Sequence, residues 1–394
     1  MGGIDLSSAS DWFEVISTLP SFLEIHLSSC LLTQFPSNPT TVGFTSLIVL
    51  DLSYNIFSDS LLPDWIFSLH NLITLDLTNC YISGLSPGTQ GGFHSMPFLK
   101  TLSVSSNTFV NSSSLLNGLS SLCNLRFLDV SNCNISTPIL ASLHNLSLIV
   151  HLDLSNNEIL EEIPKSLSNL CNLITLDLQS NNFSGNVSEL LERFCECESP
   201  KLELLTLRGN YLIGRLPEKL GRLKNLGSID IAYNQLTGTI PDSVGRKLGN
   251  VSFLVPGALL DLSFNRLHGE LPSHFNRPDL DFLDLSHNKL LGSVEQSKHK
   301  NCSTDPKSLL CERSRKSKSG LLKWLGNSPC NRLKLRSSSA PGARKLTFPN
   351  FPSVSLRDMF KNVTLENVVQ IQWGMMVSDM LLFAKSNSVK LVCD

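Results

Sequence analysis

The sequence lacks the two hydrophobic segments that would carry a chain into or across a membrane. It begins MGGIDLSSASDW, without the basic and apolar parts of a signal peptide. No run of about 18 apolar residues occurs, and the nearest candidate, residues 368–384, contains Gln370, Gln372 and Asp379. We therefore expect that the chain as written neither enters the secretory pathway nor spans a membrane.

Signatures of catalysis and of metal binding are also missing. There is no G-x-S-x-G element, phosphate-binding loop or kinase signature. The eleven cysteines include no paired C-x-x-C spacing, and the C-x-C of Cys195 and Cys197 is a weak metal signal. His144 and His151 have no cysteine or carboxylate at ligand spacing. The sequence therefore predicts a protein that is not an enzyme and that holds neither a metal nor a cofactor.

Each part of the chain is poor in charge of one sign. Residues 1–295 hold 15 Lys and Arg against 28 Asp and Glu, a net charge of −13, whereas residues 296–394 hold 17 against 6, a net charge of +11. Such a tail can be a basic arm for an anionic partner. Trp324 is the one aromatic residue between 296 and 345, so stacking on bases is not indicated and we expect no nucleic-acid partner.

What the sequence does contain is an internal repeat of 23 to 31 residues. Typical copies are LDLSYNIF (50–57), LDLSNNEI (152–159) and LDLSHNKL (283–290). The period is marked by an Asn or Cys after each copy: Cys30, Asn55, Cys80, Asn107, Cys133, Asn157, Asn181, Asn210, Asn234, Asn265 and Asn288.

Each copy indicates a short strand with one buried face. Leu50 and Leu52 point inward, while Asp51 and Ser53 point outward. The residue in the Asn or Cys position, which we call the slot, is expected to satisfy backbone groups of the next turn from inside the coil. Some turns close with L-x-G-x-[IL]-P, as in LIGRLP at 212–217, where Gly permits a tight turn and Pro stops strand pairing.

The full pattern, L-x-x-L-x-x-L-x-L-x-x-N-x-L-x-G-x-[IL]-P, resembles the plant extracellular leucine-rich repeat. The L-C-N-L phrases at 122–125 and 170–173 and the opening SASDWFEVISTLPSFLEIHLSSC are similar to plant receptor-like proteins of the kind that perceive fungal ethylene-inducing xylanase. The resemblance covers residues 4–294. It implies an α/β solenoid: a right-handed superhelix of about eleven turns with a concave parallel sheet, followed by a poorly ordered basic tail.

The resemblance also implies a function. Such proteins lie on the extracellular face of the plasma membrane, act in plant defence or development, bind a protein or peptide ligand and signal through a co-receptor kinase. Two alternatives share the architecture: a secreted inhibitor of microbial cell-wall hydrolases and the ectodomain fragment of a receptor kinase. A cytosolic scaffold is a further alternative if the frame is translated as written.

The predicted domain boundaries follow the change of pattern. We expect a truncated first repeat at 1–18, leucine-rich repeats at 19–294, a basic Ser-rich disordered segment at 295–345, and a tail of unknown structure at 346–394 with room for one short helix. No membrane anchor or Cys-paired cap is recognised, so a fragment is predicted. An interruption of the reading frame near residue 295 is preferred over a selected basic arm.

Candidate binding residues come from the outward positions of the repeats. Eight of the eleven central outward positions are Asp, which indicates a structural role in the repeat, an acidic face for a basic ligand or, least favoured, acid–base chemistry. The neighbouring outward positions vary, as recognition requires. The candidates for ligand contact on the concave face are Tyr54, Phe127, His151, Arg208, Tyr233, Phe264, Phe282 and His287.

Two further expectations concern modification and cysteine chemistry. The N-x-[ST] sequons of the repeats predict glycosylation at Asn111, Asn134, Asn145, Asn182, Asn186 and Asn250. Cys123 and Cys171 are predicted to share a buried, inert inward position and not to form a disulfide. A local bridge or a loop contact remains open for Cys195 and Cys197.

Overall fold

The computed structural model describes residues 3–9, 11–17, 22–36, 46–58, 60–86, 92–110, 115, 118–143, 145–164, 167, 169–245, 259–272 and 282–291, together with five short strands between 301 and 371. The chain divides into two compact units, Met1–Ser314 and Arg315–Asp394. In the second unit the structure describes an antiparallel sheet of β18 (Leu321–Trp324), β19 (Leu333–Arg336) and β20 (Gln370–Ile371).

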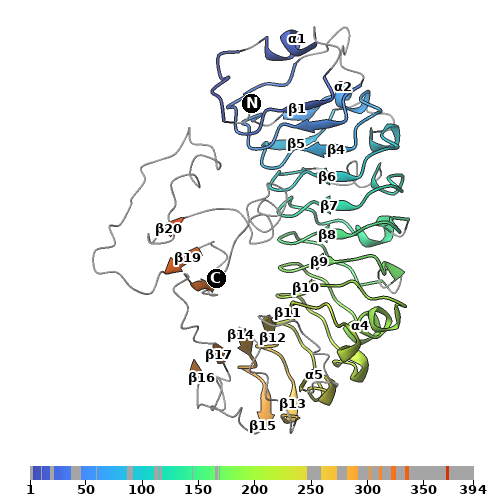
Figure 1. Ribbon diagram of the computed structural model, residues 1–394, viewed down its shortest axis with the longest axis vertical. Helices are drawn as coiled ribbons and strands as arrows, with labels where there is room; N and C mark the ends of the chain where they lie inside the picture. The colour runs from blue at the N-terminus through green and yellow to red at the C-terminus, as the bar shows by residue number, and fades with distance from the viewer. Residues whose placement is uncertain are drawn as a thin grey trace. The chain divides into compact units, whose positions relative to one another are not determined.

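The first unit is built around one long sheet of three-residue strands, stacked along its concave side (Figure 1). Eleven strands are parallel and in register. They are β1 (Glu24–His26), β2 (Val49–Asp51), β4 (Thr74–Asp76), β6 (Thr101–Ser103), β7 (Phe127–Asp129), β8 (His151–Asp153), β9 (Thr175–Asp177), β10 (Leu204–Thr206), β11 (Ser228–Asp230), β12 (Leu259–Asp261) and β14 (Phe282–Asp284). β17 (Leu310–Glu312) then pairs antiparallel with β14, and β16 (Asn301–Cys302) with β17.

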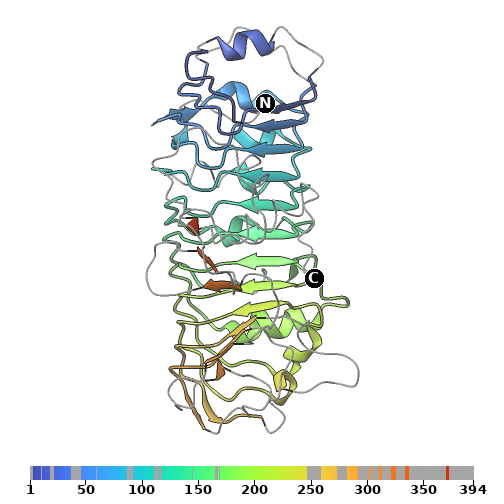
Figure 2. The ribbon, with the colours of Figure 1, turned by 60° about the vertical axis from the view of Figure 1, so that its left-hand side comes forward.

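The segments between these strands lie on the other side of the unit (Figure 2). They hold short helices and short outer strands. These elements are β3 (Ser60–Leu62), α2 (Asp64–Phe67), β5 (Ile82–Leu85), η1 (Gly92–Ser95), η2 (Leu140–Leu143), α4 (Val187–Glu196), η4 (Glu218–Arg222), α5 (Asp242–Gly245), β13 (His268–Glu270) and β15 (Lys289–Leu291). A further helix, α1 (Trp12–Ser17), precedes β1. No helix among the described residues is long and apolar enough to cross a membrane.

The middle residue of each strand and the residue after the strand point into a continuous apolar core, as Leu50 and Leu52 do. A single turn could not bury this surface, so each turn depends on its neighbours. Residues at the start of the chain continue the stack, since Gly3 and Leu6 donate to the carbonyls of Ser28 and Cys30 at 2.8 Å. The predicted α/β solenoid is confirmed.

The slot asparagines satisfy the backbone of the preceding turn. Asn55 is fully buried, and its Nδ2 donates to the carbonyls of Leu27 in that turn (2.8 Å) and Leu52 in its own turn (2.7 Å). Its Oδ1 accepts from the N–H groups of Cys30 (3.1 Å) and Leu32 (2.9 Å). The expectation that a slot residue hydrogen-bonds the backbone of the next turn is wrong. Backbone N–H groups point forward along the stack, so each turn finds its acceptor in the slot residue of the turn that follows it.

Slot residues divide the first unit into two regions. In the alternating region, β1–β8, they read Cys30, Asn55, Cys80, Asn107, Cys133 and Asn157; in the all-Asn region, β9–β14, all five are Asn. Cys offers one weak donor and no amide oxygen. The thiols of Cys80 and Cys133 donate to preceding-turn carbonyls at 3.0 and 3.1 Å, so half of the role of an Asn side chain is left to other groups.

The backbone supplies the missing acceptor beside cysteine. The residue after each slot cysteine has a left-handed conformation, with φ of 57° at Leu31, 57° at Tyr81 and 56° at Asn134. The residue after a slot asparagine does not. With this conformation the Cys133 carbonyl accepts the N–H of Phe109 at 3.3 Å. If the next slot held an asparagine, this N–H would bond to the Oδ1 of that asparagine.

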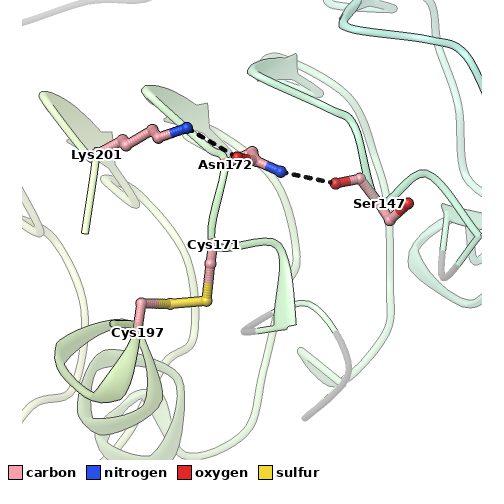
Figure 3. The surroundings of a disulfide bond; sticks show 5 residues. All are labelled: Ser147, Cys171, Asn172, Cys197 and Lys201. Carbon is pink, nitrogen blue, oxygen red and sulfur yellow. Dashed lines mark hydrogen bonds between the residues drawn. A yellow bond between two sulfur atoms is a disulfide. The ribbon is translucent and has the colours of Figure 1, made fainter. Parts of the chain in front are cut away.

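A disulfide joins Cys171, just before β9, to Cys197 at the end of α4, with 5.8 Å between the Cα atoms (Figure 3). Cys123, at the equivalent position of an earlier repeat, is exposed. The prediction that Cys123 and Cys171 are buried and unbridged is therefore wrong. In the L-C-N-L phrase the two leucines point into the core, so the cysteine between them faces outward.

Helix α4 places Cys197 for this bond. Asn186 caps the helix by accepting from Ser188 N at 2.9 Å, and the helix buries Leu190, Leu191 and Phe194. Beside the bond, Lys201 Nζ donates to Asn172 Oδ1 at 3.0 Å, and Asn172 Nδ2 donates to Ser147 O at 3.2 Å (Figure 3). The C-x-C sequence thus ends an amphipathic helix, and the disulfide from Cys197 bonds this helix end to Cys171 just before β9.

Candidate ligand-binding face

The outward side chains of β1–β14 form what we call the sheet face. Three columns run along it: the residue that opens each strand, the residue that ends the strand, and the residue three positions after the end. The middle column is the Asp row, consisting of Asp51, Asp76, Asp129, Asp153, Asp177, Asp230, Asp261 and Asp284, interrupted by Ser103 and Thr206.

The Asp row has a structural role in every turn where it occurs. Oδ1 of each aspartate accepts from the backbone N–H two residues later at 2.9 to 3.0 Å. This bond turns the chain at the end of the strand. The structural interpretation of the repeated Asp is therefore confirmed, and each second carboxylate oxygen is left for other contacts.

Burial raises the pKa of six of these carboxyls, those of Asp76, Asp129, Asp153, Asp177, Asp230 and Asp261. Burial, followed by the neighbouring Asp51 carboxylate, raises the pKa of Asp76 to about 7. Burial also raises the pKa of Asp177 to about 7 and that of Asp129 above its ordinary value. For Asp153, burial acts together with Asp177 and Asp129. The face is thus less charged at neutral pH than its composition suggests, and a cation placed beside the row would favour ionisation.

Within the described residues, the guanidinium of Arg208 forms ion pairs with this row. Arg208 follows β10, and its Nη1 lies 3.0 Å from Asp261 Oδ2 and 3.4 Å from Asp230 Oδ2. The guanidinium carbon lies 4.6 Å from the centre of the Tyr233 ring. Two carboxylates and an aromatic ring therefore hold a guanidinium on the sheet face, a combination that is stronger than an exposed ion pair.

The aromatic ring under Arg208 begins a stack that crosses three turns. The Tyr233 and Phe264 rings are 4.0 Å apart and inclined by 11°, and the Phe264 and His287 rings are 3.8 Å apart and inclined by 10°. The three residues occupy the third column in consecutive turns. Four of the eight candidates are therefore brought together.

The other candidates lie elsewhere on the face. Phe127 and His151 open β7 and β8, with ring centres 5.9 Å apart, and His151 Nδ1 lies 3.0 Å from Thr175 Oγ1. Tyr54 is in the third column after β2, far along the stack from the others. Phe282 opens β14, across the Asp row from His287. The structure thus separates a β7–β8 pair, Tyr54 after β2, and a group around β10–β14.

The third column has an unusual backbone for aromatic residues. Its members are left-handed in every turn, including Tyr54 (φ 58°), Tyr233 (54°), Phe264 (52°) and His287 (57°). Bulky residues seldom adopt this conformation. In this fold the turn imposes it at each repeat, which fixes the direction of the side chain and lets rings of successive turns meet face to face.

Sequence reasoning missed two partners of this group. Asp230 and Asp261 were placed in the structural column, and their ion pairs with Arg208 were not predicted. Leu259, half-buried at the start of β12, was also omitted. The signal was available in the repeat itself, because aligned turns put Leu259 and Phe282 in one column beside the Asp row.

The predicted glycosylation sites differ in exposure. Asn134 and Asn145 are exposed, Asn182 is half-buried and Asn186 is exposed while its Oδ1 caps α4. Asn111 and Asn250 lie outside the described residues. No group of three potential metal ligands occurs in the part of the chain that the structure describes.

Comparison with known proteins identifies the repeats. The Leucine Rich Repeat family model matches residues 71–93, 124–146, 149–170, 172–194 and 225–246. The receptor-like protein EIX2 of Solanum lycopersicum is 34% identical over 128 residues, which are 32% of this chain and 12% of that protein. The chain therefore carries leucine-rich repeats and is similar over a short part of its length to a much longer plant receptor-like protein.

Two solved plant receptors have the same architecture. The peptide hormone receptor RGFR1 in complex with RGF2 matches with a TM-score of 0.50 and 30% identity over 63% of this chain and 37% of that chain. A TDR receptor matches with a TM-score of 0.60 and 27% identity over 75% of this chain and 50% of that chain. In both cases this chain spans half of the relative or less.

Proposed function

We propose that this chain is part of a plant cell-surface receptor-like protein and that its sheet face binds a protein or peptide ligand without catalysis. The observation that carries the proposal is the contrast within each strand. Buried positions are apolar and nearly constant from turn to turn, whereas the outward columns beside the Asp row change in almost every turn. A constant backbone with varying side chains suits recognition of an extended partner.

Three observations support this assignment. RGFR1, which is similar to this chain, was solved with RGF2 bound. The Cys171–Cys197 disulfide fits an oxidising compartment such as the cell exterior. Exposed Asn134 and Asn145 fit glycosylation in the secretory pathway. The family resemblance also implies a second partner, a co-receptor kinase. In its most specific form, the proposed function is perception of a xylanase-like elicitor.

The proposal is tested by selecting ligands for the full chain. The chain, preceded by a signal peptide and secreted from plant cells, is panned against a random peptide library, and selected peptides are measured by calorimetry. We expect binding that Phe127→Ser combined with Tyr233→Ser weakens about tenfold or more. The control, Phe98→Ser with Leu160→Ser, changes two exposed residues outside the strands. No selected peptide, or loss of binding in the control alone, would overturn the proposal.

A further inference from the structure

The outward side chains of β10–β14 form a surface of their own, which we call the C-terminal aromatic surface. The Asp row runs through its middle, with Leu259 and Phe282 on one side and the ring stack on the other. Its members are Arg208, Tyr233, Leu259, Asp261, Phe264, Phe282, Asp284 and His287. His287 is exposed and the other apolar and aromatic members are half-buried. In β2–β9, by contrast, the flanking positions are mostly Thr, Ser and Asn.

Arg208 shows which chemical group this surface accepts. Its guanidinium contacts two carboxylates of consecutive strands and packs on the ring of the third column. The position of Arg208 is occupied by Ala232, Ser263 and Ser286 in the three turns that follow. These turns repeat the carboxylates and the rings without a basic residue at that position.

The charge of this surface is left unbalanced. Arg208 is shared between Asp230 and Asp261, and among the described residues no ion pair involves Asp284. Asp284 lies directly beside Asp261 in the sheet, and its carboxylate contributes to the raised pKa of Asp261, after burial as the main cause. A cation at Asp284 would relieve this repulsion.

We propose that the C-terminal aromatic surface binds a peptide segment in which a lysine or arginine adjoins an aromatic or aliphatic residue. The ligand's cation lies at Asp284, as Arg208 does at Asp261, and its apolar side chain lies against Phe282 and Leu259. Charge complementarity selects this occupant over an acidic peptide, and the flanking rings select it over a purely polar one. This inference rests on the proposed function and names its ligand class.

Asp284→Asn is the sharpest test, because asparagine keeps the Oδ1 that accepts from Ser286 N at 2.9 Å. The matched control is Asp76→Asn, which makes the same change where Thr74 and Asn79 flank the row. Both variants are made in the full chain, checked for folding by circular dichroism, and titrated with the peptides selected from the random library. Each titration is done at low and high salt.

The selected peptides are expected to combine Lys or Arg with a neighbouring aromatic or aliphatic residue. Asp284→Asn should weaken them about tenfold or more and reduce the salt dependence of binding, whereas Asp76→Asn should leave affinity within about twofold. Peptides that bind the sheet face but are acidic, or that respond to Asp76→Asn and not to Asp284→Asn, would overturn this inference alone. Absence of any sheet-face binding would overturn the proposed function with it.

Discussion

The alternating region and the all-Asn region have the same strands and differ both inside and outside. Inside, the alternating region places cysteine in every second slot and rotates the next residue into a left-handed conformation. Outside, it carries mostly hydroxyl and amide side chains, while the all-Asn region carries Arg208 and the ring stack. One backbone therefore tolerates two ways of satisfying its buried polar groups, and the Arg208 ion pairs and the ring stack lie in the all-Asn region.

The difference teaches that the asparagines are not equivalent. An Asn that follows a Cys turn accepts two backbone N–H groups, as Asn107 does from Cys80 (3.1 Å) and Ile82 (2.9 Å). An Asn that follows an Asn turn accepts one backbone N–H, that of the residue two positions after the preceding slot, as Asn234 does from Leu212 at 3.0 Å. In the alternating region each asparagine therefore serves its own turn and part of the preceding cysteine turn.

Replacing Asn107 with alanine should have the largest effect. The change leaves buried carbonyls and two N–H groups without partners, so we expect the free energy of unfolding to fall by about 3–5 kcal/mol. The matched Asn234→Ala should cost about 1 kcal/mol less, because one fewer N–H is orphaned. Urea unfolding gives both values, and hydrogen exchange should show faster exchange at Cys80 and Ile82 in the first variant. Equal losses would mean that the second acceptor bond has no energetic weight.

The junction of the two regions is held by the disulfide. Cys171→Ser removes the link between the segment before β9 and the end of α4 and should lower the free energy of unfolding by about 2–4 kcal/mol. Protease cleavage near 193–200 should rise, because α4 loses its C-terminal attachment. The control is Cys123→Ser, the exposed thiol at the same repeat position, with an expected change below about 0.5 kcal/mol. Similar stability of the two variants would show that the bond adds nothing beyond the packing of Leu190 and Phe194.

The repeating core was predictable from sequence because its signal is local and occurs many times. Alternating leucines give the strands, and the slot asparagines identify the period. The disulfide was not predictable, since it depends on α4, whose helical pattern of Leu190, Leu191 and Phe194 follows the capping residue Asn186. That pattern falls between two strand copies, where turn-by-turn alignment treats it as an insertion.

The sequence predicted which side chains of the candidate site point outward, but not which of them contact one another. Arg208, Tyr233, Phe264 and His287 were recognised as outward residues. Their stacking depends on the left-handed backbone of the third column and on equal strand register across turns of unequal length. The reach of Arg208 across two strands to Asp261 involves 53 residues of sequence separation, which no local pattern encodes.

The raised pKa of Asp177, in the all-Asn region, predicts how the stability of the protein depends on pH. Burial raises the pKa of Asp177 to about 7, so the folded state binds a proton that the unfolded state releases above about pH 4. Its contribution therefore favours folding at low pH and is lost as pH rises from about 4 to 7. Asp177→Asn keeps the bond to Gln179 N and should stabilise the protein by about 1–2 kcal/mol at pH 8, with little effect at pH 4.

Thermal unfolding at a series of pH values measures this difference. Asp242→Asn, which removes one carboxylate from an exposed position outside the row, is the control. A pH-independent offset for Asp177→Asn would show that the carboxyl stays ionised when folded. Adding Arg208→Gln should then steepen the dependence, because the guanidinium beside Asp230 and Asp261 favours their ionised forms.

Tyr81 and Tyr211 give the smallest and most closely matched comparison. Both follow a slot residue and are about equally exposed, at 56% and 57%, but Tyr81 follows a cysteine and has φ of 57°, whereas Tyr211 follows an asparagine and is not left-handed. Glycine adopts the left-handed conformation without strain and costs entropy elsewhere. Tyr81→Gly should therefore be more favourable than Tyr211→Gly by about 1 kcal/mol in the free energy of unfolding. If the two variants lose equal stability, the cysteine turns carry no backbone strain, and the acceptor bond of the Cys carbonyl alone accounts for their conformation.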